Sequence, residues 1–158
     1  MGPRGKAITL AGLLKDKFIS LDLKGNNKQE VIANLVELIA ISKKLKNKKA
    51  FYKTVLERER LGSTGIGGGV AIPHAKSKVV SGFILVFARK GEGMDFGALD
   101  GEKTYLFFAL ASPEHEVGAH LKILAEISRL VKDKFIVERL KRAKDNKEIT
   151  RIIAMATR

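Results

Sequence analysis

The sequence predicts a single domain of the layered α/β class. Three short apolar runs, rich in β-branched and aromatic residues, lie in the middle of the chain, and segments with helical spacing precede and follow them. Strands enclosed by helices along the chain are typical of a sheet that is covered by helices. The length of 158 residues suits one such domain, and no repeat or low-complexity linker divides it.

Two helices are expected before the strands. Asn27 opens a capping box, after which apolar residues recur at helical spacing as far as about Leu45. Asn47 is expected to cap a second helix that runs to about Arg60. Five of the eight residues 62–69 are glycine, so a loop is expected there instead of a helix.

Three buried strands and three further helices are expected after this loop. The strands are the apolar runs at residues 70–72, 83–88 and 105–110, with a loop at residues 91–101 between the last two. The helices are expected at residues 118–132, at residues 135–142 and from the capping box at Asp145 onward.

Composition excludes several classes of function. The chain has no cysteine, which excludes disulfides, thiolate catalysis and metal sites with cysteine ligands. It has no apolar run of membrane-spanning length and no signal peptide, so a cytoplasmic protein without membrane insertion is expected. The domain is expected to span residues 7–154, after a leader or tag remnant at residues 1–6 and before a C-terminal tail at residues 155–158.

The chain is strongly basic. Thirty lysines and arginines against 17 acidic residues give a net charge of +13. This excess suits nucleic acid, acidic proteins or phosphorylated groups as partners, and it also suits a heat-adapted chain. Basic residues cluster at 43–49 and at 139–147, but no exposed aromatic residues are interleaved with them, which is more typical of solvated helix ends than of a nucleic-acid surface.

The glycine-rich loop is the most unusual segment. Ser63, Thr64 and Gly65 offer hydroxyl and backbone N–H groups that suit a bound phosphoryl group. The segment matches no P-loop, no dinucleotide-binding fingerprint and no nucleophile elbow. A purely structural turn, with the two hydroxyls stabilising the loop, is the alternative.

Two of the three histidines are candidates for chemistry. His74 is expected just beyond a strand, where sites collect in α/β sheets, and a neutral imidazole nitrogen can carry a phosphoryl group. His120 lies on the apolar stripe of the predicted helix 118–132, so it faces the core or a cleft. The alternative for both is a hydrogen-bonded structural histidine. His115 is expected to be solvated, and a metal site built from the three histidines is the weaker interpretation.

Arg58 precedes the glycine loop at the end of a predicted helix. A guanidinium at this position could pair with a phosphoryl group through two hydrogen bonds. The alternative is that Arg58 and Arg60 only complement the dipole of the helix.

The motifs together resemble one family. The pair Arg58-Glu59, the Gly-Ser-Thr-Gly-Ile-Gly loop from Gly62 and the Pro-His-Ala sequence at His74 are similar to the signature of the fructose, mannitol and nitrogen-type IIA domains of the bacterial phosphotransferase system. The segments 94–101 and 113–124 also resemble that family, and the similarity covers residues 7–154. The resemblance implies an α/β sandwich, with a mixed central sheet between helices on both faces.

The resemblance also implies a function and a site. The protein would be a phosphocarrier in which His74 accepts a phosphoryl group from HPr or an HPr-like protein. His120 would support His74 as the second active-site histidine, and Arg58 would help to hold the site. The group would pass to a IIB component or act as a regulatory signal on a target protein. No metal, nucleotide or other cofactor is implied.

Two points remain open at the level of the sequence. The chain has no fused membrane or IIB segment, so a free-standing IIA is expected, and the form of its motif favours the nitrogen or regulatory branch over sugar transport. In the family that this chain resembles, HPr offers a basic rim to IIA, which a charge of +13 would repel. Either the surface around His74 is locally apolar or acidic, or the carrier is unusual.

Two other functions are alternatives to the phosphocarrier. One is a basic module that binds nucleic acid or an acidic protein. The other is a degenerate IIA domain that senses without being phosphorylated, against which the presence of His74, His120 and Arg58 argues.

Overall fold

The computed structural model describes residues 8–157, which form one sheet and the helices that cover it. The helices, in chain order, are α1 (Leu10–Leu13), α2 (Lys28–Ile39), α3 (Lys48–Leu61), α4 (Val117–Val131), α5 (Lys134–Arg142) and α6 (Asn146–Ala156), with a 3₁₀ turn at Asp16–Phe18. The strands are β1 (Ile19–Ser20), β2 (Gly65–Gly67), β3 (Val70–Ala71), β4 (His74–Ser77), β5 (Ile84–Met94) and β6 (Thr104–Pro113). The predicted leader at residues 1–6 lies outside the described residues.

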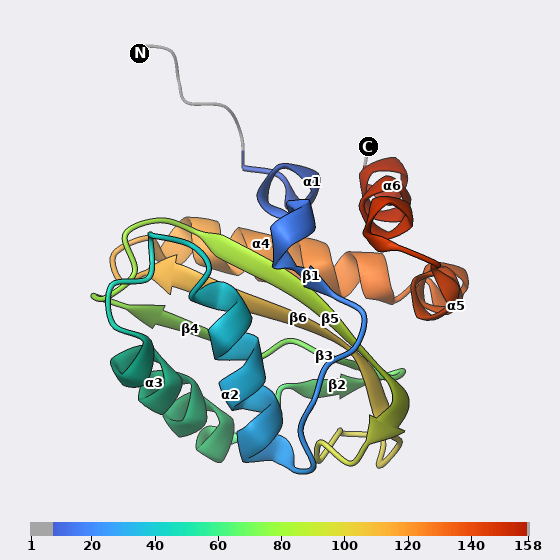
Figure 1. The fold of residues 1–158 in the computed structure, drawn as a ribbon, viewed down its shortest axis with the longest axis horizontal. Coiled ribbons are helices and arrows are strands. Elements are labelled where there is room, and N and C mark those ends of the chain that lie inside the picture. Colours follow the sequence, from blue (N-terminus) through green and yellow to red (C-terminus); the bar gives the residue numbers. More distant parts are fainter. Residues whose placement is uncertain (1–7, 158) are drawn as a thin grey trace.

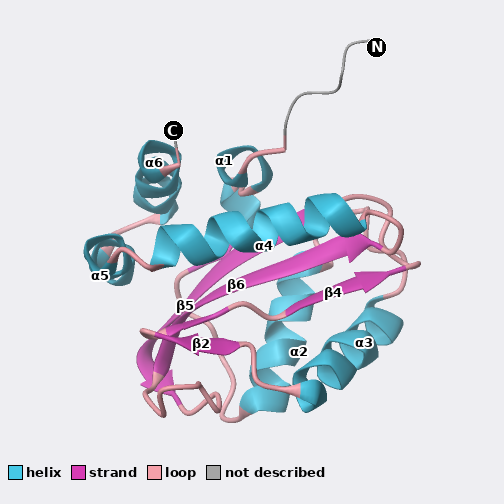
Figure 2. Ribbon diagram, turned by 180° about the vertical axis from the view of Figure 1, so that it is seen from behind, coloured by secondary structure: helices cyan, strands magenta, loops and turns pink. Residues whose placement is uncertain are grey.

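The sheet is mixed, and the long β5–β6 hairpin forms its centre. The strand order is β1-β5-β6-β3-β2, and β4 pairs with the same side of β6 as β3 does. The β5–β6 and β2–β3 pairs are antiparallel, whereas β1 runs parallel to β5 and both β3 and β4 run parallel to β6. Helices α2 and α3 cover one face and α4 covers the other (Figures 1 and 2). The predicted α/β class, with a mixed sheet between helices, is confirmed.

The helix starts follow the predicted caps. Asn27, Asn47 and Asp145 each accept a hydrogen bond from a backbone N–H in the first turn of α2, α3 and α6. The Glu30 carboxylate accepts the backbone N–H of Asn26, the residue before the cap, so Glu30 supports the start of α2 one residue earlier than in a standard capping box. These contacts are local, which is why the sequence alone predicts them.

The helix expected as far as Leu45 ends at Ile39. Residues after it turn away to pair with the segment that follows β4. Leu45 forms an isolated antiparallel bridge with Val80, and the backbone N–H of Lys46 donates to the Val79 carbonyl at 2.7 Å. This long-range pairing overrides the helical spacing of the apolar residues.

The loop expected at residues 91–101 begins later than predicted, because β5 continues to Met94. The register with β6 shifts between Arg89 and Met94, which is the sign of a bulge. Gly93 has a φ of +71°, and a Cβ there would lie 2.7 Å from the ring of Tyr105. Any side chain at position 93 would clash with the Tyr105 ring, so glycine is required for β5 to continue past this point.

The core lies on both faces of the β5–β6 hairpin. Phe87 and Phe108 meet edge to face at a centroid distance of 5.1 Å, and Phe96 and Phe107 meet in the same way at 5.3 Å. All four are fully buried. This packing makes the hairpin a rigid support for the strands that pair with β6. No helix in residues 8–157 is both long and apolar enough to cross a membrane.

Candidate active site

His74 is the first residue of β4, at a break in the edge of the sheet. The prediction placed it just beyond a strand, and the structure shows that a second short strand starts with it. Residues 72 and 73 separate β3 from β4, and Pro73 has no N–H with which to continue the ladder. The break sets His74 where the chain re-enters the sheet beside Leu110 of β6.

The backbone selects one tautomer of His74. Its Nδ1 lies 2.6 Å from the carbonyl oxygen of Ile72. A carbonyl only accepts hydrogen bonds, so Nδ1 carries the proton and donates it. In the neutral ring Nε2 then keeps its lone pair, which is the form that a nucleophile needs. His74 is half-buried.

His120 lies in the first turns of α4, with its side chain turned inward as its place on the apolar stripe predicted. It is 2% exposed, and its Nδ1 lies 2.7 Å from the hydroxyl oxygen of Ser112. Ser112 is itself fully buried on β6, opposite Lys76 of β4. The end of β6 and the start of α4 therefore hold this ring from two sides.

The two histidines meet although 46 positions separate them in the chain. Their ring centroids are 5.5 Å apart, with a tilt of 51° between the planes. Burial, together with the neighbouring His74 and Lys76, lowers the pKa of His120 to about 4, and burial is the largest cause. Burial also lowers the pKa of His74 from its usual 6.5, although the bond to Ile72 acts the other way. Both rings are therefore neutral at pH 7.

Arg58 lies in the last turn of α3, close enough to His74 for its charge to lower the pKa of that ring. Its Nη1 donates to the carbonyl of Gly62 at 2.9 Å, beyond the end of the helix. Both alternatives raised for Arg58 thus have a structural basis, since it binds the chain at the helix end and places positive charge at His74. The structure brings His74 and His120 together, and α3, whose last turn holds Arg58, packs against β4, which begins at His74.

The glycine loop is held from inside by Glu59, to which the sequence motifs assign no role. Glu59 is buried, and its two carboxylate oxygens accept the hydroxyl of Thr64 at 2.6 Å and the backbone N–H of Thr64 at 2.9 Å. Lys28 of α2 pairs with the same carboxylate at 2.8 Å and lies 4.5 Å from the centroid of the Phe96 ring. In the sequence, the only indication of the contact between Glu59 and Thr64 is that a glutamate directly follows Arg58.

Ser63 and Gly65 are also engaged within the loop. The Ser63 hydroxyl donates to the carbonyl of Phe96 at 2.9 Å and accepts the backbone N–H of Gly65 at 3.0 Å. The hydroxyl protons of both Ser63 and Thr64 are therefore used to hold the loop, as the structural alternative expects. Phosphoryl binding by Ser63, Thr64 and Gly65 remains a prediction.

The third histidine is remote from this chemistry. The side chain of His115 is 84% exposed and lies 3.9 Å from a carboxylate oxygen of Glu116. Among the described residues 8–157, no three or more histidine, aspartate or glutamate side chains gather as a metal site would require.

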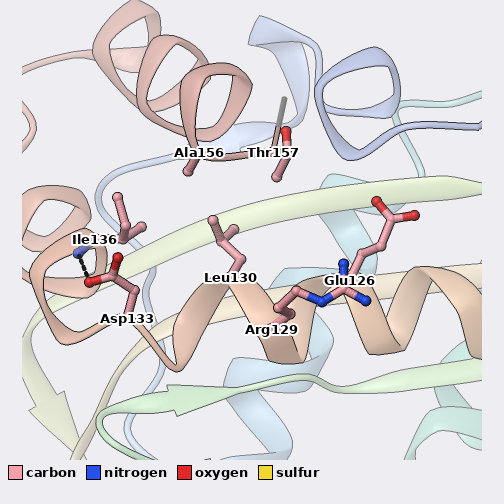
Figure 3. Close-up of a pocket in the computed structure, with 7 residues that line it drawn as sticks. All are labelled: Glu126, Arg129, Leu130, Asp133, Ile136, Ala156 and Thr157. Carbon is pink, nitrogen blue, oxygen red and sulfur yellow. Dashed lines mark hydrogen bonds between the residues drawn. The ribbon is translucent and has the colours of Figure 1, made fainter.

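A cavity of about 310 Å³ lies elsewhere in the molecule, between the end of α4, the start of α5 and the end of α6. Figure 3 shows its lining, in which Glu126, Arg129 and Asp133 supply the charged side chains. It contains none of the candidate site residues, so the histidine pair and not this cavity is the candidate active site.

Fold and site together define a small α/β domain that presents a pair of neutral histidines at a strand break, next to an arginine and a glycine loop. The family model described as the phosphoenolpyruvate-dependent sugar phosphotransferase system, EIIA 2, matches residues 12–156. The chain belongs to this family of phosphotransferase system EIIA domains. Membership does not favour the rival function of a nucleic-acid or acidic-protein binding module.

Relatives from two branches of the family resemble the chain. A nitrogen regulatory protein of Bradyrhizobium diazoefficiens is 38% identical over 150 residues, which cover 92% of this chain and 95% of that protein. The fructose-specific EIIABC component of Bacillus subtilis is 35% identical over 89% of this chain, which spans 22% of that longer protein. The crystal structure of the nitrogen regulatory protein IIA-Ntr from Neisseria meningitidis superposes with a TM-score of 0.85 at 30% identity, covering 91% of this chain and 98% of that one.

Proposed function

We propose that the protein is a phosphocarrier that accepts a phosphoryl group on Nε2 of His74 from the phosphohistidine of HPr or an HPr-like protein. The observation that carries this proposal is the 2.6 Å hydrogen bond from Nδ1 of His74 to the Ile72 carbonyl, which leaves the lone pair on Nε2. Family membership supports phosphoryl transfer as the chemistry. The group then passes to a IIB component or serves as a regulatory signal on a target protein.

The transfer balances without an added acid or base. The lone pair of Nε2 forms a bond to phosphorus while the phosphorus–nitrogen bond of the donor breaks, and the electron pair of that bond stays on the donor's nitrogen. The proton of His74 stays on Nδ1 throughout and keeps its hydrogen bond to the Ile72 carbonyl. Such a step depends on in-line positioning and on charge stabilisation more than on covalent help from the protein.

The groups around His74 supply that stabilisation. Arg58 and Lys76 disfavour a proton on the ring, and the same positive charges favour the dianionic phosphoryl group once it arrives. When the Ser112 hydroxyl donates to Nδ1 of His120, Nε2 of His120 carries the proton and can donate it to a phosphoryl oxygen. His120 thus acts as a neutral donor. Thr64 and Ser63 act by holding the loop in place.

Phosphorylation followed by intact mass tests this proposal. The protein is incubated with phosphoenolpyruvate, the general phosphotransferase enzyme and HPr, and we expect one acid-labile phosphoryl group. His74→Ala abolishes the label, whereas the matched control His115→Ala, at an exposed histidine, keeps it. His120→Ala slows labelling by about a hundredfold through loss of one transition-state donor. A label that persists in His74→Ala, or that disappears in His115→Ala, contradicts the assignment.

A further inference from the structure

A strip of lysines lies beside the histidine pair. We call the side chains of Lys43, Lys44, Lys46, Lys76 and Lys78 the basic edge. All five are exposed. They come from two segments far apart in the sequence, the turn between α2 and α3 and the chain from β4 onward. In the sequence only the first of these segments stands out as a cluster.

Backbone hydrogen bonds join the two segments into one surface. The N–H of Lys46 donates to the Val79 carbonyl at 2.7 Å, and the N–H of Ser81 donates to the Lys44 carbonyl at 2.9 Å. Figure 1 shows the turn after α2 next to the chain that leaves β4, on the left of the molecule. The lysines are therefore held side by side by the fold.

The basic edge begins next to His74. Lys76 follows His74 by two positions on β4, so both side chains stand on the same face of the strand, about 7 Å apart along it. Lys76 is opposite Ser112, the residue that holds His120. The charge of Lys76 reaches both histidine rings, since it lowers the pKa of each.

Acidic residues do not neutralise this surface. Glu37 pairs with Lys48, which adjoins the edge, at 2.8 Å. Glu114 and Glu116 are exposed at the turn between β6 and α4, near the end of β4. None of the five lysines of the basic edge forms an ion pair within the described residues 8–157. An excess of positive charge remains.

We propose that the protein that exchanges a phosphoryl group with His74 presents an acidic face, which docks on the basic edge. This inference rests on the proposed function. A specific interface of ordinary size covers about 800 Å² on each partner, which is a disc of about 16 Å radius. A partner centred on His74 therefore covers Lys76 and the chain after it. Desolvating these lysines against a basic partner is unfavourable, and an acidic partner offsets the cost.

A protein fits this surface better than nucleic acid does. Val117 and Leu121, in the first turns of α4 around His120, are 49% and 59% exposed, and such apolar side chains suit the centre of a protein interface. The segments 40–49 and 76–81 contain no aromatic residue on which bases could stack. The basic edge beside His74 therefore favours an unusual, acidic carrier over a carrier with a basic rim.

Two matched charge reversals test the proposal. Lys43→Glu/Lys46→Glu reverses the basic edge, and Lys144→Glu/Lys147→Glu makes the same change in net charge near the start of α6, among exposed residues. The probes are phosphoramidate, as a small donor that needs no docking, and phosphorylated HPr in two forms whose surface around the active histidine is acidic or basic.

We expect the acidic HPr to label the wild-type protein faster than the basic HPr. Lys43→Glu/Lys46→Glu lowers the rate with the acidic form by about tenfold, and the control changes it less than about twofold. Raising the salt concentration lowers the rate of transfer from the acidic HPr to the wild-type protein. Phosphoramidate labels all variants alike.

The outcomes separate the two proposals. Faster transfer from the basic HPr, or equal rates in the two charge variants, overturns the acidic partner. Tight binding of a short DNA duplex that Lys43→Glu/Lys46→Glu abolishes, without any effect on transfer from HPr, assigns the surface to nucleic acid and also overturns it. Failure of phosphoramidate to label His74, while the protein is folded, contradicts the proposed function itself.

Discussion

The carbonyl of Ile72 determines what His74 can do. A solvated imidazole exchanges its proton between the two nitrogens, whereas a bond of 2.6 Å to a backbone acceptor holds the proton on Nδ1. The sequence placed His74 near a strand end but held no information on which nitrogen would be free. A backbone acceptor two residues away leaves no motif of its own, because every residue has a carbonyl.

The lowered pKa of His74 predicts how phosphoryl acceptance depends on pH. Because the neutral ring is the nucleophile, labelling by phosphoramidate weakens only as the pH falls through a pKa that lies below 6.5. Labelling rates of the protein and of N-acetylhistidine are compared at each pH, so that titration of the donor cancels. We expect the protein to retain its rate to a lower pH than N-acetylhistidine. Parallel loss of the two rates would show that burial does not control this ring.

His120 predicts a pH dependence of stability. In the unfolded chain its pKa is about 6.5, and in the folded protein it is about 4, so the unfolded state binds the proton first. The contribution of His120 is complete above pH 6.5 and is lost as the pH falls toward 4, by about 3 kcal/mol in all. Urea unfolding at a series of pH values measures this slope. His120→Gln should flatten the curve over that interval, and an unchanged slope in this variant would assign the effect to other groups.

At the scale of elements, α3 and the glycine loop form one unit that leads into the site. Arg58 and Glu59 are neighbours on α3, but they turn in different directions, the first to the loop carbonyl of Gly62 and the second to the buried hydroxyl of Thr64. Lys28 connects this unit to α2. The backbone N–H of Ile72 donates to the Thr64 carbonyl at 2.9 Å, so this unit is joined to the chain just before His74. The surroundings of His74 therefore depend on Glu59 and Lys28 as well as on Arg58.

Removing the charge of Glu59 tests this role. Glu59→Gln weakens the hydrogen bonds to Thr64 and leaves the ammonium of Lys28 without its partner, which costs about 2 kcal/mol of unfolding free energy. Amide hydrogen exchange at Thr64 should accelerate, and labelling of His74 should slow. Glu57→Gln, at an exposed position on the same helix, is the matched control and should change neither. Equal protection of the Thr64 amide in both variants would mean that the carboxylate does not hold the loop.

At the scale of the whole molecule, the β5–β6 hairpin is the centre on which the rest of the sheet is built. Every other strand except β2 pairs with one of its two members, and the buried rings of Phe87, Phe107 and Phe108 lie on it. The histidines are attached to the same support, since His74 pairs with β6 and His120 contacts Ser112 of β6. Stability and site geometry therefore have a common origin.

Truncation in this core predicts a large loss of stability. Phe108→Ala removes a fully buried ring and its contact with Phe87, so the free energy of unfolding should fall by about 3–5 kcal/mol. The control Phe135→Ala changes a phenylalanine that is 69% exposed and should cost less than about 0.5 kcal/mol. Urea unfolding followed by circular dichroism measures both. Similar losses in the two variants would mean that the hairpin core is not the main source of stability.

Local contacts explain how much of the fold could be predicted. Caps at Asn27, Asn47 and Asp145 and the apolar centres of β5 and β6 involve residues close in the chain, and each was predicted. The strand β4 and the early end of α2 were missed because their partners lie on β6 and after β4, far along the sequence. In the site, motifs indicated His74, His120 and Arg58 individually, whereas the role of Glu59 depends on its burial and on its contacts with Thr64 and Lys28, which no motif signals.

The sequence by itself determined the family, the α/β class and the identity of the three candidate residues, because motif, cap and periodicity are properties of neighbouring residues. Only the tertiary structure decided that the two histidine rings lie 5.5 Å apart, that Nε2 of His74 is free and that lysines from two segments form one surface beside it. The contact between the rings and the lysine surface depend on packing or hydrogen bonds between segments distant in the chain. The free nitrogen of His74 depends on a carbonyl two residues away, which no residue type signals. Local propensity contains no information on such pairings, and the fold establishes them through the strands that align on β6.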